Sequence, residues 1–334
     1  MLENVAIDAS GAIVFFNKIC IDGHSNGCFI RFVTHVHSDH TVNLSKSLLL
    51  CKHISGTPIT LDLLDVLGYS IPKIKKLPLN YDQLLEFENI RIRLYYSDHI
   101  PGSAQVSVEK EGILLAYTGD FKNPGSKTVI IKEPHVLIID ATYGDPIYVR
   151  EGEDIIWQKF VELVKKLLSQ GSISMYAYYG KAHEVMMKLR EYGIDAPFLL
   201  SHSHWKVHRV LERYGYRIQD VFPSGSRESE EVRKTGWFIE VNHISSAKNY
   251  RNTSFHIILT GRFAKTIYRL NSSNTWIVGI SGHADFNDII YYVDESKPHL
   301  LIVDASRSSY AEKFASIVEE QLGIKSMVMP KTIF

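Results

Sequence analysis

The chain has 334 residues, of which 45% are hydrophobic, and its 37 Lys/Arg residues balance its 37 Asp/Glu residues. This length is sufficient to bury a substantial core, and we expect two compact units. No run approaches about 18 uninterrupted apolar residues, and the first residues lack the pattern of a signal peptide. Cys20, Cys28 and Cys51 show no CxxC spacing, so we expect reduced thiols in a cytoplasmic protein with no membrane contact.

Short apolar runs separated by turn residues fill the first 140 residues and predict a sheet-rich layer with a few helices. The predicted strands are residues 12–16, 18–21, 29–33, 47–51, 90–96, 104–108, 113–117 and 136–139. The pattern changes near residues 144–146, after which residues 154–169 predict an amphipathic helix with its apolar residues on one face.

Strands and helices then alternate, as is typical of a small α/β unit with parallel strands. The predicted elements are strands 173–178 and 198–200, helices 181–192 and 205–214, strands 237–241, 255–259, 276–280 and 300–303, and helix 309–322. We expect a discontinuous main domain of residues 1–144 and 276–334, with a cap domain of residues 145–275 inserted into it.

The charge is distributed unevenly between these two parts. Residues 145–275 hold 19 Lys/Arg and 14 Asp/Glu, a net charge of +5, and the remainder holds 18 and 23, a net charge of −5. A basic segment beside an acid-rich one would suit a polyanionic substrate. A chance imbalance between two solvated faces is the alternative, because the difference is small.

A dense group of polar side chains follows the predicted strand 29–33, in the run His35-Val36-His37-Ser38-Asp39-His40. Delivering three imidazoles and a carboxylate from a buried strand is costly unless something binds them. Imidazole and carboxylate suit zinc or a similar divalent ion, and this run has enough donors to begin a site for two metals.

Four more candidates stand at the carboxyl ends of predicted strands, namely His99, Asp120, Asp140 and His283. His99 precedes a Pro-Gly turn, which would hold its ring still. An aspartate such as Asp120 has two oxygens and can bridge two metals about 3.5–4 Å apart. One polar residue at a strand end is unremarkable, whereas several at successive strand ends indicate a common site.

These motifs together resemble the β-CASP nucleases. They are the His35–His40 run, His99, Thr118-Gly119-Asp120-Phe121, Asp140-Ala141-Thr142-Tyr143-Gly144 and Ser281-Gly282-His283-Ala284-Asp285. That family includes cleavage-and-polyadenylation nucleases, RNase J-type enzymes and DNA nucleases of crosslink repair. The resemblance implies an α/β fold, namely a metallo-β-lactamase αββα sandwich with an inserted α/β cap domain.

The resemblance also implies roles for individual residues. His35, His37 and His99 would hold a first zinc, with Asp120 as the bridge to a second metal. Asp39 and His40 would face the second metal, and Asp22 would support their loop from behind. Asp140 would orient His283, which in the family is associated with the scissile phosphate and the leaving group. Asp39, Asp140 and His283 are therefore the catalytic candidates.

One position departs from the family pattern. RNA-cleaving members carry a further histidine about twenty residues after the SGHAD-type motif, and here Asp304 stands at the end of the corresponding strand. The DNA-repair branch also lacks that histidine. An aspartate could still ligate zinc or a harder cation such as manganese. One metal and two metals therefore both remain open.

In the predicted cap, Gly180-Lys181 opens a helix and could bind phosphate at its N-terminus, although an ordinary helix start is the alternative. Ser224, Ser226 and Arg227 could form a second phosphate-holding turn, or a plain loop. Tyr176, Tyr178 and Tyr179 are more typical of half-buried strand residues than of a stacking surface. His202, His204 and His208 are expected to be structural.

The combined prediction is a metal-dependent phosphodiesterase that cleaves nucleic acid, with RNA favoured over DNA. A DNA exonuclease of the repair type is the first alternative, and a small-molecule hydrolase or a non-catalytic scaffold is less favoured. No appended RNA-binding domain is evident, so targeting is expected to need a homo-oligomer or an RNA-processing partner.

Overall fold

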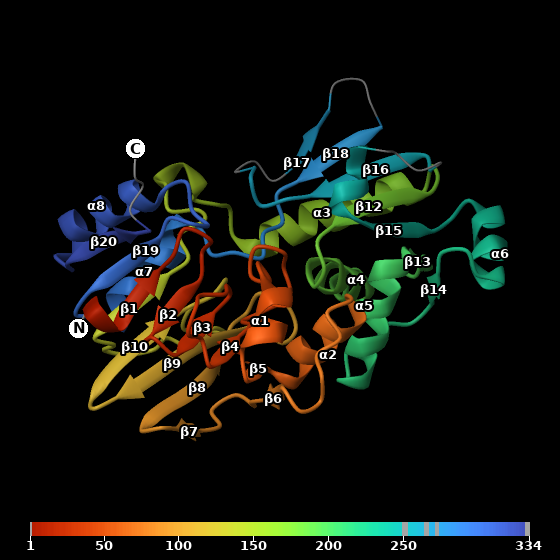
Figure 1. The fold of residues 1–334 in the computed structure, drawn as a ribbon. Coiled ribbons are helices and arrows are strands. Elements are labelled where there is room, and N and C mark those ends of the chain that lie inside the picture. The colour runs from red at the N-terminus through yellow and green to blue at the C-terminus, as the bar shows by residue number, and fades with distance from the viewer. Residues whose placement is uncertain (1, 249–252, 264–266, 271–273, 331–334) are drawn as a thin grey trace. The chain divides into compact units, whose positions relative to one another are not determined.

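The computed structural model describes residues 2–248, 253–263, 267–270 and 274–330 (Figure 1). The chain divides into two compact units. Unit 1 comprises residues 1–149 and 283–334, and unit 2 comprises residues 150–282. The sequence placed the breaks after residues 144 and 275.

The first sheet of unit 1 has six strands in the order β1-β2-β3-β4-β5-β6. They are β1 (Val5–Ile7), β2 (Ile13–Phe15), β3 (Ile19–Ile21), β4 (Ile30–Phe32), β5 (His53–Gly56) and β6 (Lys76–Pro78), preceded by the short helix η1 (Leu2–Asn4). Strands β3 to β6 are parallel to one another. Helices α1 (Leu44–Leu50) and α2 (Pro58–Val66) contact β5, and α2 also contacts β6.

The second sheet has seven strands in the order β20-β19-β11-β10-β9-β8-β7. They are β7 (Leu85–Phe87), β8 (Ile90–Tyr96), β9 (Ala104–Lys110), β10 (Ile113–Tyr117), β11 (Val136–Ile139), β19 (Leu301–Asp304) and β20 (Ser326–Met329). Strands β8, β10, β11 and β19 run in the same direction, so their carboxyl ends share one edge of the sheet.

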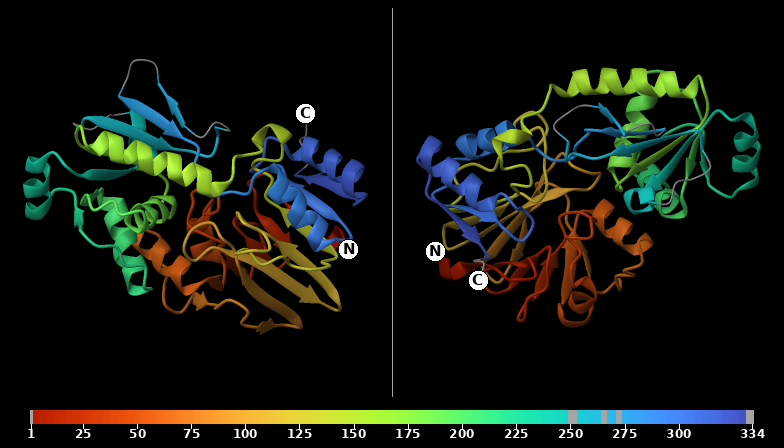
Figure 2. Two further views of the ribbon diagram at one scale, coloured as in Figure 1. Left: turned by 180° about the vertical axis from the view of Figure 1, so that it is seen from behind. Right: turned by 90° about the horizontal axis from the view of Figure 1, so that it is seen from above.

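The core of unit 1 is built in two layers around the second sheet. Side chains such as Phe15 and Phe32 of the first sheet pack against Ile92 and Val106 of the second. The other face of the second sheet is covered by α7 (Phe286–Ser296) and α8 (Ala311–Leu322), beside the short helix η2 (Pro146–Tyr148). The result is the αββα sandwich expected from the sequence (Figure 2).

Unit 2 is a single sheet in the order β14-β13-β15-β12-β16-β18-β17, parallel except for β17. Its strands are β12 (Ile173–Ala177), β13 (Phe198–Leu200), β14 (Val221–Pro223), β15 (Ile239–His243), β16 (Phe255–Leu259), β17 (Ile267–Arg269) and β18 (Thr275–Val278). Its helices are α3 (Glu153–Leu168), α4 (Lys181–Glu191), α5 (His202–Arg213), α6 (Arg227–Thr235) and η3 (Ile244–Lys248). Apolar side chains of α3 and α4 pack on one face of the sheet.

One local expectation is wrong. The predicted strand 47–51 lies in helix α1 and the residue that follows it. Its leucine triplet has neither strand alternation nor β-branched side chains, and leucine is a strong helix former. The polar stretch after Ser226, for which no helix was predicted, forms helix α6, in which the Ser226 hydroxyl accepts a hydrogen bond from the amide of Ser229 at 3.1 Å. Only Ser229 of α6 is buried, so the sequence offered no apolar periodicity.

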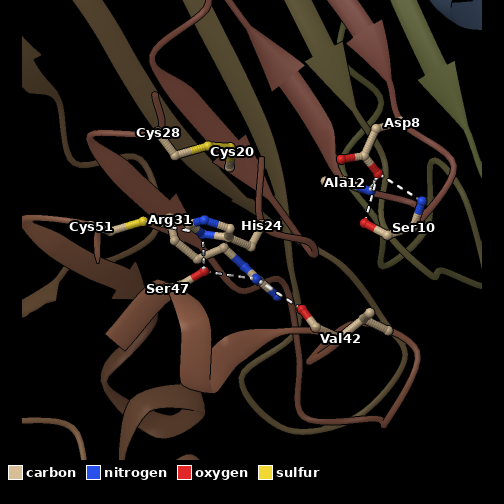
Figure 3. The surroundings of a disulfide bond; sticks show 10 residues. All are labelled: Asp8, Ser10, Ala12, Cys20, His24, Cys28, Arg31, Val42, Ser47 and Cys51. Carbon is tan, nitrogen blue, oxygen red and sulfur yellow. Dashed lines mark hydrogen bonds between the residues drawn. A yellow bond between two sulfur atoms is a disulfide. The ribbon is translucent and has the colours of Figure 1, made fainter. Parts of the chain in front are cut away.

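The expectation of three reduced thiols is also wrong, because Cys20 and Cys28 form a disulfide (Figure 3). Cys20 lies in the middle of β3, and Cys28 precedes β4, the strand paired with it. Their Cα atoms are 5.8 Å apart, within the range that a disulfide requires. A CxxC criterion misses such a pair because neighbouring strands bring the two residues together. Cys51 is a free, buried thiol.

Among the described residues, no helix combines the length and the hydropathy that a membrane crossing requires.

Candidate metal centre

The His35–His40 run begins three residues after β4, and Asp22 at the end of β3 fixes its start. The Asp22 carboxylate accepts hydrogen bonds from the amide of Thr34 at 2.8 Å and from its hydroxyl at 2.6 Å. Strands β3 and β4 are parallel neighbours, so their carboxyl ends meet at this point. The run therefore starts from a rigid backbone.

The first group of candidate ligands comprises His35, His37, His99 and Asp120, whose donor atoms all lie within 4.8 Å of one another. His37 Nδ1 lies 3.1 Å from both His35 Nε2 and His99 Nε2. Asp120 Oδ2 lies 3.4 Å from the same two Nε2 atoms. Ligands at zinc–nitrogen distances would be about 3.3 Å apart on a tetrahedron, so the spacing fits a tetrahedral metal.

The other oxygen of Asp120 faces His40. His40 Nε2 lies 3.1 Å from Asp120 Oδ1 and 3.3 Å from Asp39 Oδ2. It is buried and has no hydrogen-bond partner among the described residues. Its other ring nitrogen, Nδ1, lies 2.7 Å from Asp22 Oδ2. A carboxylate behind the ring fixes the Nδ1–H tautomer and leaves Nε2 free to bind a metal.

Asp140 and His283 lie at the same sheet edge. His283 Nδ1 is 3.1 Å from Asp140 Oδ2, and Nε2 is 3.7 Å from Asp120 Oδ2. The other Asp140 oxygen accepts hydrogen bonds from the amide and hydroxyl of Thr142. The amide of Ala284 donates to the Phe121 carbonyl, which holds the His283 backbone beside Asp120. Asp120, Asp140 and His283 form the second group of candidate ligands.

Burial and charge set the protonation states of this centre. Burial raises the pKa of Asp120, but the imidazole of His40 and its neighbours outweigh burial and hold it well below its usual range. Burial lowers the pKa of His40, yet the carboxylates of Asp120 and Asp39 raise it well above the ordinary value. Burial lowers the pKa of both His35 and His99. Neutral His35 and His99 beside an ionised Asp120 are the forms that bind a metal, whereas His40 would release a proton when an ion binds.

Asp304 belongs to neither group. Its Oδ1 atom accepts hydrogen bonds from the amide of Ser306 at 2.8 Å and from the Ser306 hydroxyl. Its Oδ2 atom accepts from Arg307 Nη1 at 2.8 Å. The structure thus brings together every proposed ligand except Asp304.

The candidates of unit 2 lie at helix starts. Gly180, with a φ of 76°, precedes α4, and the buried Lys181 ammonium donates to the Ile280 carbonyl at 2.8 Å. Ser226 caps α6, whose first residue, Arg227, is exposed. The Ser224 hydroxyl lies 3.2 Å from Glu240 Oε1 and 2.9 Å from Arg233 Nη2. Their binding of phosphate stays a prediction.

Sequence reasoning missed two buried arginines that bind backbone carbonyls near the His35–His40 run. The loop of residues 35–42 that follows β4 is called the metal-centre loop below. Arg31 on β4 is fully buried and donates to the carbonyl of Val42 at 3.1 Å (Figure 3). It also donates to the carbonyl of His40 at 3.0 Å. Arg307 donates to the carbonyls of Asp22 and Asp39. A charge inside the apolar run 29–33 was a readable signal for Arg31, whereas nothing local marked Arg307.

No family model matches the chain. An uncharacterized protein in the lig 3′ region of Acidianus ambivalens is 40% identical over 138 residues, which are 41% of this chain and 98% of that protein. A probable RNase of Methanocaldococcus jannaschii, MJ4, is 23% identical over 78% of this chain and 63% of its own length. The mouse DNA cross-link repair 1A protein is 29% identical over 38% of this chain and 12% of its own length.

A solved structure of a protein of unknown function from Enterococcus faecalis matches 90% of this chain and 79% of its own, with a TM-score of 0.60 and 14% identity. This likeness shows a shared fold. This chain spans less than two thirds of either named nuclease or repair relative.

Proposed function

Because this chain belongs to the β-CASP family of metallo-β-lactamase-fold nucleases, we propose that it is a metal-dependent phosphodiesterase that cleaves nucleic acid, with RNA as the first-choice substrate. One observation carries the proposal. The carboxylate of Asp120 divides its two oxygens between two sets of imidazoles, with Oδ2 facing His35 and His99 and Oδ1 facing His40. That arrangement suits a bridge between two divalent ions.

We propose zinc as the metal, with manganese as a second option. His35, His37, His99 and Asp120 would hold one ion, and Asp39, His40 and Asp120 would hold the other. A bound ion of this kind lowers the pKa of water toward neutrality and polarises a phosphoryl oxygen. The observation that best fits such an ion is the buried Nε2 atom of His40, which has no hydrogen-bond partner among the described residues.

The chain's own side chains supply the remaining chemistry. Asp22 accepts a hydrogen bond from Nδ1 of His40, which orients the ring so that Nε2 faces the proposed ion. Asp140 holds the ring of His283 through Nδ1, so that Nε2 can donate a proton to the oxygen that leaves when the phosphorus–oxygen bond breaks. Asp39 contributes its carboxylate beside His40.

Unit 2 is proposed to hold the nucleic-acid backbone. Residues 145–275 carry a net charge of +5, and the starts of α4 and α6 point amide N–H groups away from the helices. Gly180, Ser224, Ser226 and Arg227 are the proposed contacts. Because Lys181 donates to the Ile280 carbonyl, we expect it to fix the start of α4 as well as add positive charge.

DNA is the second candidate substrate, favoured by the surroundings of Asp304. Its carboxylate accepts hydrogen bonds from Ser306 and Arg307, so among the described residues the late ligand of the RNA-cleaving members has no counterpart in the candidate centre. The DNA cross-link repair protein among the relatives is consistent with this alternative.

Replacing Asp120 with alanine tests the proposed activity. We expect metal content to fall and cleavage of single-stranded RNA to drop by more than about 100-fold, because a ligand shared by both ions is lost. Metal analysis and a panel of single-stranded RNA, single-stranded DNA and bis(p-nitrophenyl) phosphate are the measurements. Asp62→Ala, on helix α2, is the matched control and should retain both metal and activity.

Unchanged cleavage by the Asp120→Ala protein would refute the metal-dependent mechanism. Cleavage of DNA but not RNA by the wild-type protein would favour the second candidate. No cleavage of any substrate in zinc or manganese would favour a scaffold without catalytic activity.

A further inference from the structure

We propose that Arg307 is a positioning residue for the loop that carries Asp39 and His40, and that Asp304 acts by holding this arginine rather than by ligating a metal. The inference deepens the proposed function and rests on it, because the loop matters only if it binds a metal.

The guanidinium group of Arg307 connects four separate segments of unit 1. Its Nη1 atom donates to Asp304 Oδ2 at 2.8 Å and to the Gly11 carbonyl at 3.0 Å. Its Nη2 atom donates to the Asp22 carbonyl at 2.9 Å and to the Asp39 carbonyl at 3.0 Å. The side chain is 5% exposed. These bonds tie the ends of β3 and β19 to the metal-centre loop.

The carboxylate of Asp304 is committed to this arrangement. It is 1% exposed, and both of its oxygens accept hydrogen bonds, Oδ1 from Ser306 and Oδ2 from Arg307. Turning it toward a metal would leave a buried guanidinium without its counter-charge, which is strongly destabilising. We therefore expect Asp304 to stabilise the fold by holding Arg307, and not to ligate a metal.

The planar guanidinium is what makes this link possible. Its donors form a rigid fork that can reach three carbonyl oxygens and a carboxylate at once. A lysine ammonium is a single nitrogen, and cannot contact the Asp22 and Asp39 carbonyls while it also reaches the Asp304 carboxylate and the Gly11 carbonyl. Arg307→Lys should therefore keep the charge but lose the positioning.

A second arginine makes the effect of Arg307 specific to one part of the loop. Arg31 holds the carbonyls of His40 and Val42 from the β4 side, so the loop stays folded when Arg307 is changed. Arg307 itself reaches Asp39, whose carboxylate belongs to the second set of donors with His40. Among the described residues, the Arg307 guanidinium donates to Gly11, Asp22, Asp39, Asp304 and Ser306, and not to His35, His37 or His99.

The test measures binding of Zn²⁺ and Co²⁺ to the full chain by chelator competition and Co²⁺ absorption, independently of cleavage. We expect two equivalents in the wild type. Arg307→Lys and Arg307→Ala should weaken the second equivalent by about 10–100-fold, as is usual for groups behind a ligand, and leave the first unchanged. Asp304→Asn should act in the same direction. The double variant Asp304→Asn/Arg307→Ala should be no worse than Arg307→Ala, because the two residues act as one unit.

Arg91→Ala is the matched control, since Arg91 forms an exposed ion pair with Glu109 at 3.3 Å and should bind both equivalents normally. Thermal unfolding of each metal-free variant checks that the fold is intact. If Arg307→Ala does not fold, the metal-binding comparison is made with Arg307→Lys and Asp304→Asn instead.

Three results would overturn the inference. The first is wild-type affinity for both equivalents in every Arg307 variant. The second is loss of the second equivalent in Asp304→Asn with normal binding in Arg307→Lys, which would make Asp304 a ligand. The third is a single equivalent in the wild type, because no second site would exist. A wild-type protein that binds no metal would instead refute the proposed function, and this inference with it.

Discussion

Asp120 is the single residue on which the site depends most. Its two oxygens face His40 on one side and His35, His99 and His283 on the other. Since one carboxylate takes part in every group, substitutions of its neighbours should not have additive effects on metal binding. Asp120 lies in a short turn after β10. The Ser97 hydroxyl holds the backbone of this turn by donating to the Asp120 carbonyl at 2.6 Å.

Two buried histidines of unit 2 predict a pH-dependent stability. Burial lowers the pKa of His183 and of His204 to about 3, with further lowering by neighbouring imidazoles. The unfolded chain binds protons below about pH 6.5, while the folded chain does not until pH 3. The free energy of unfolding of unit 2 should therefore fall as the pH decreases through this window, by up to about 1.4 kcal/mol per pH unit for each histidine.

All four tryptophans lie in unit 2, at positions 157, 205, 237 and 276, so urea unfolding followed by tryptophan fluorescence reports on this unit. His183→Gln should reduce the pH dependence between 6.5 and 3, and His202→Gln, at an exposed position of the same unit, should not. An identical slope in wild type and His183→Gln would contradict the prediction.

The types of residue at the candidate metal centre could be predicted from the sequence, because histidines and aspartates at strand ends are visible in a one-dimensional pattern. The pairing of His283 with Asp140, 143 residues apart, was implied by the resemblance to the β-CASP nucleases. No local pattern could show this pairing, because it depends on the order of strands in the sheet. Arg307 and the Cys20–Cys28 disulfide have no local signature, because their contacts arise from segments that meet only in the folded unit.

Among the secondary-structure elements, the buried strands of the second sheet were the easiest to predict. Strand β8 alternates buried and less buried residues, and β11 is a short, fully buried run. Helix α1 was mistaken for a strand because its buried residues are Leu44 and Ser47, with Leu49 and Leu50 exposed. When leucines face the solvent, the spacing of apolar residues no longer follows the buried face of a helix. The hydrophobic pattern of residues 47–51 therefore could not distinguish a helix from a strand.

The turn after β3 predicts a packing-sensitive position. A Cβ atom at Gly23 would lie 2.2 Å from the Cα atom of Ala12 and 2.6 Å from its nitrogen, and backbone atoms cannot move aside cheaply. Gly23→Ala should lower the free energy of unfolding of unit 1 by about 1–3 kcal/mol or more. Circular dichroism during thermal unfolding is the measurement. Gly152→Ala, with nothing within 4 Å, is the control, and equal melting of the two variants would refute the prediction.

For the molecule as a whole, the division into two units predicts separate responses to metal. The candidate ligands all lie in unit 1, and a metal that binds only the folded state stabilises the unit that binds it. Adding a chelator should lower the unfolding temperature of unit 1 and leave that of unit 2 unchanged. Calorimetry combined with tryptophan fluorescence distinguishes the two transitions. A chelator-induced shift of the fluorescence transition alone would argue against metal sites in unit 1.

The alternation of strands and helices indicated an inserted middle segment, and the resemblance to the β-CASP nucleases implied the αββα sandwich. The limits of the two units differ from those expected. The sequence placed the second break after residue 275, near strand β18, which belongs to unit 2. Strand β18 pairs in parallel with β16, and that pairing rather than any change in composition decides its membership. A change in composition indicates only roughly where one unit gives way to the other. The hydrogen bonds between strands determine to which unit a strand such as β18 belongs.

The insertion of unit 2 within unit 1 has a consequence for synthesis on the ribosome. Strand β19 pairs with β11, and His283 and Arg307 contact residues that were made more than 140 residues earlier, namely the Asp140 side chain and the Asp22 carbonyl. A nascent chain that has emerged as far as unit 2 already contains His35, His37, His99 and Asp120, but neither His283 nor Arg307. The centre is therefore completed only when the last segment emerges, so an unfinished polypeptide should lack the His283–Asp140 pair.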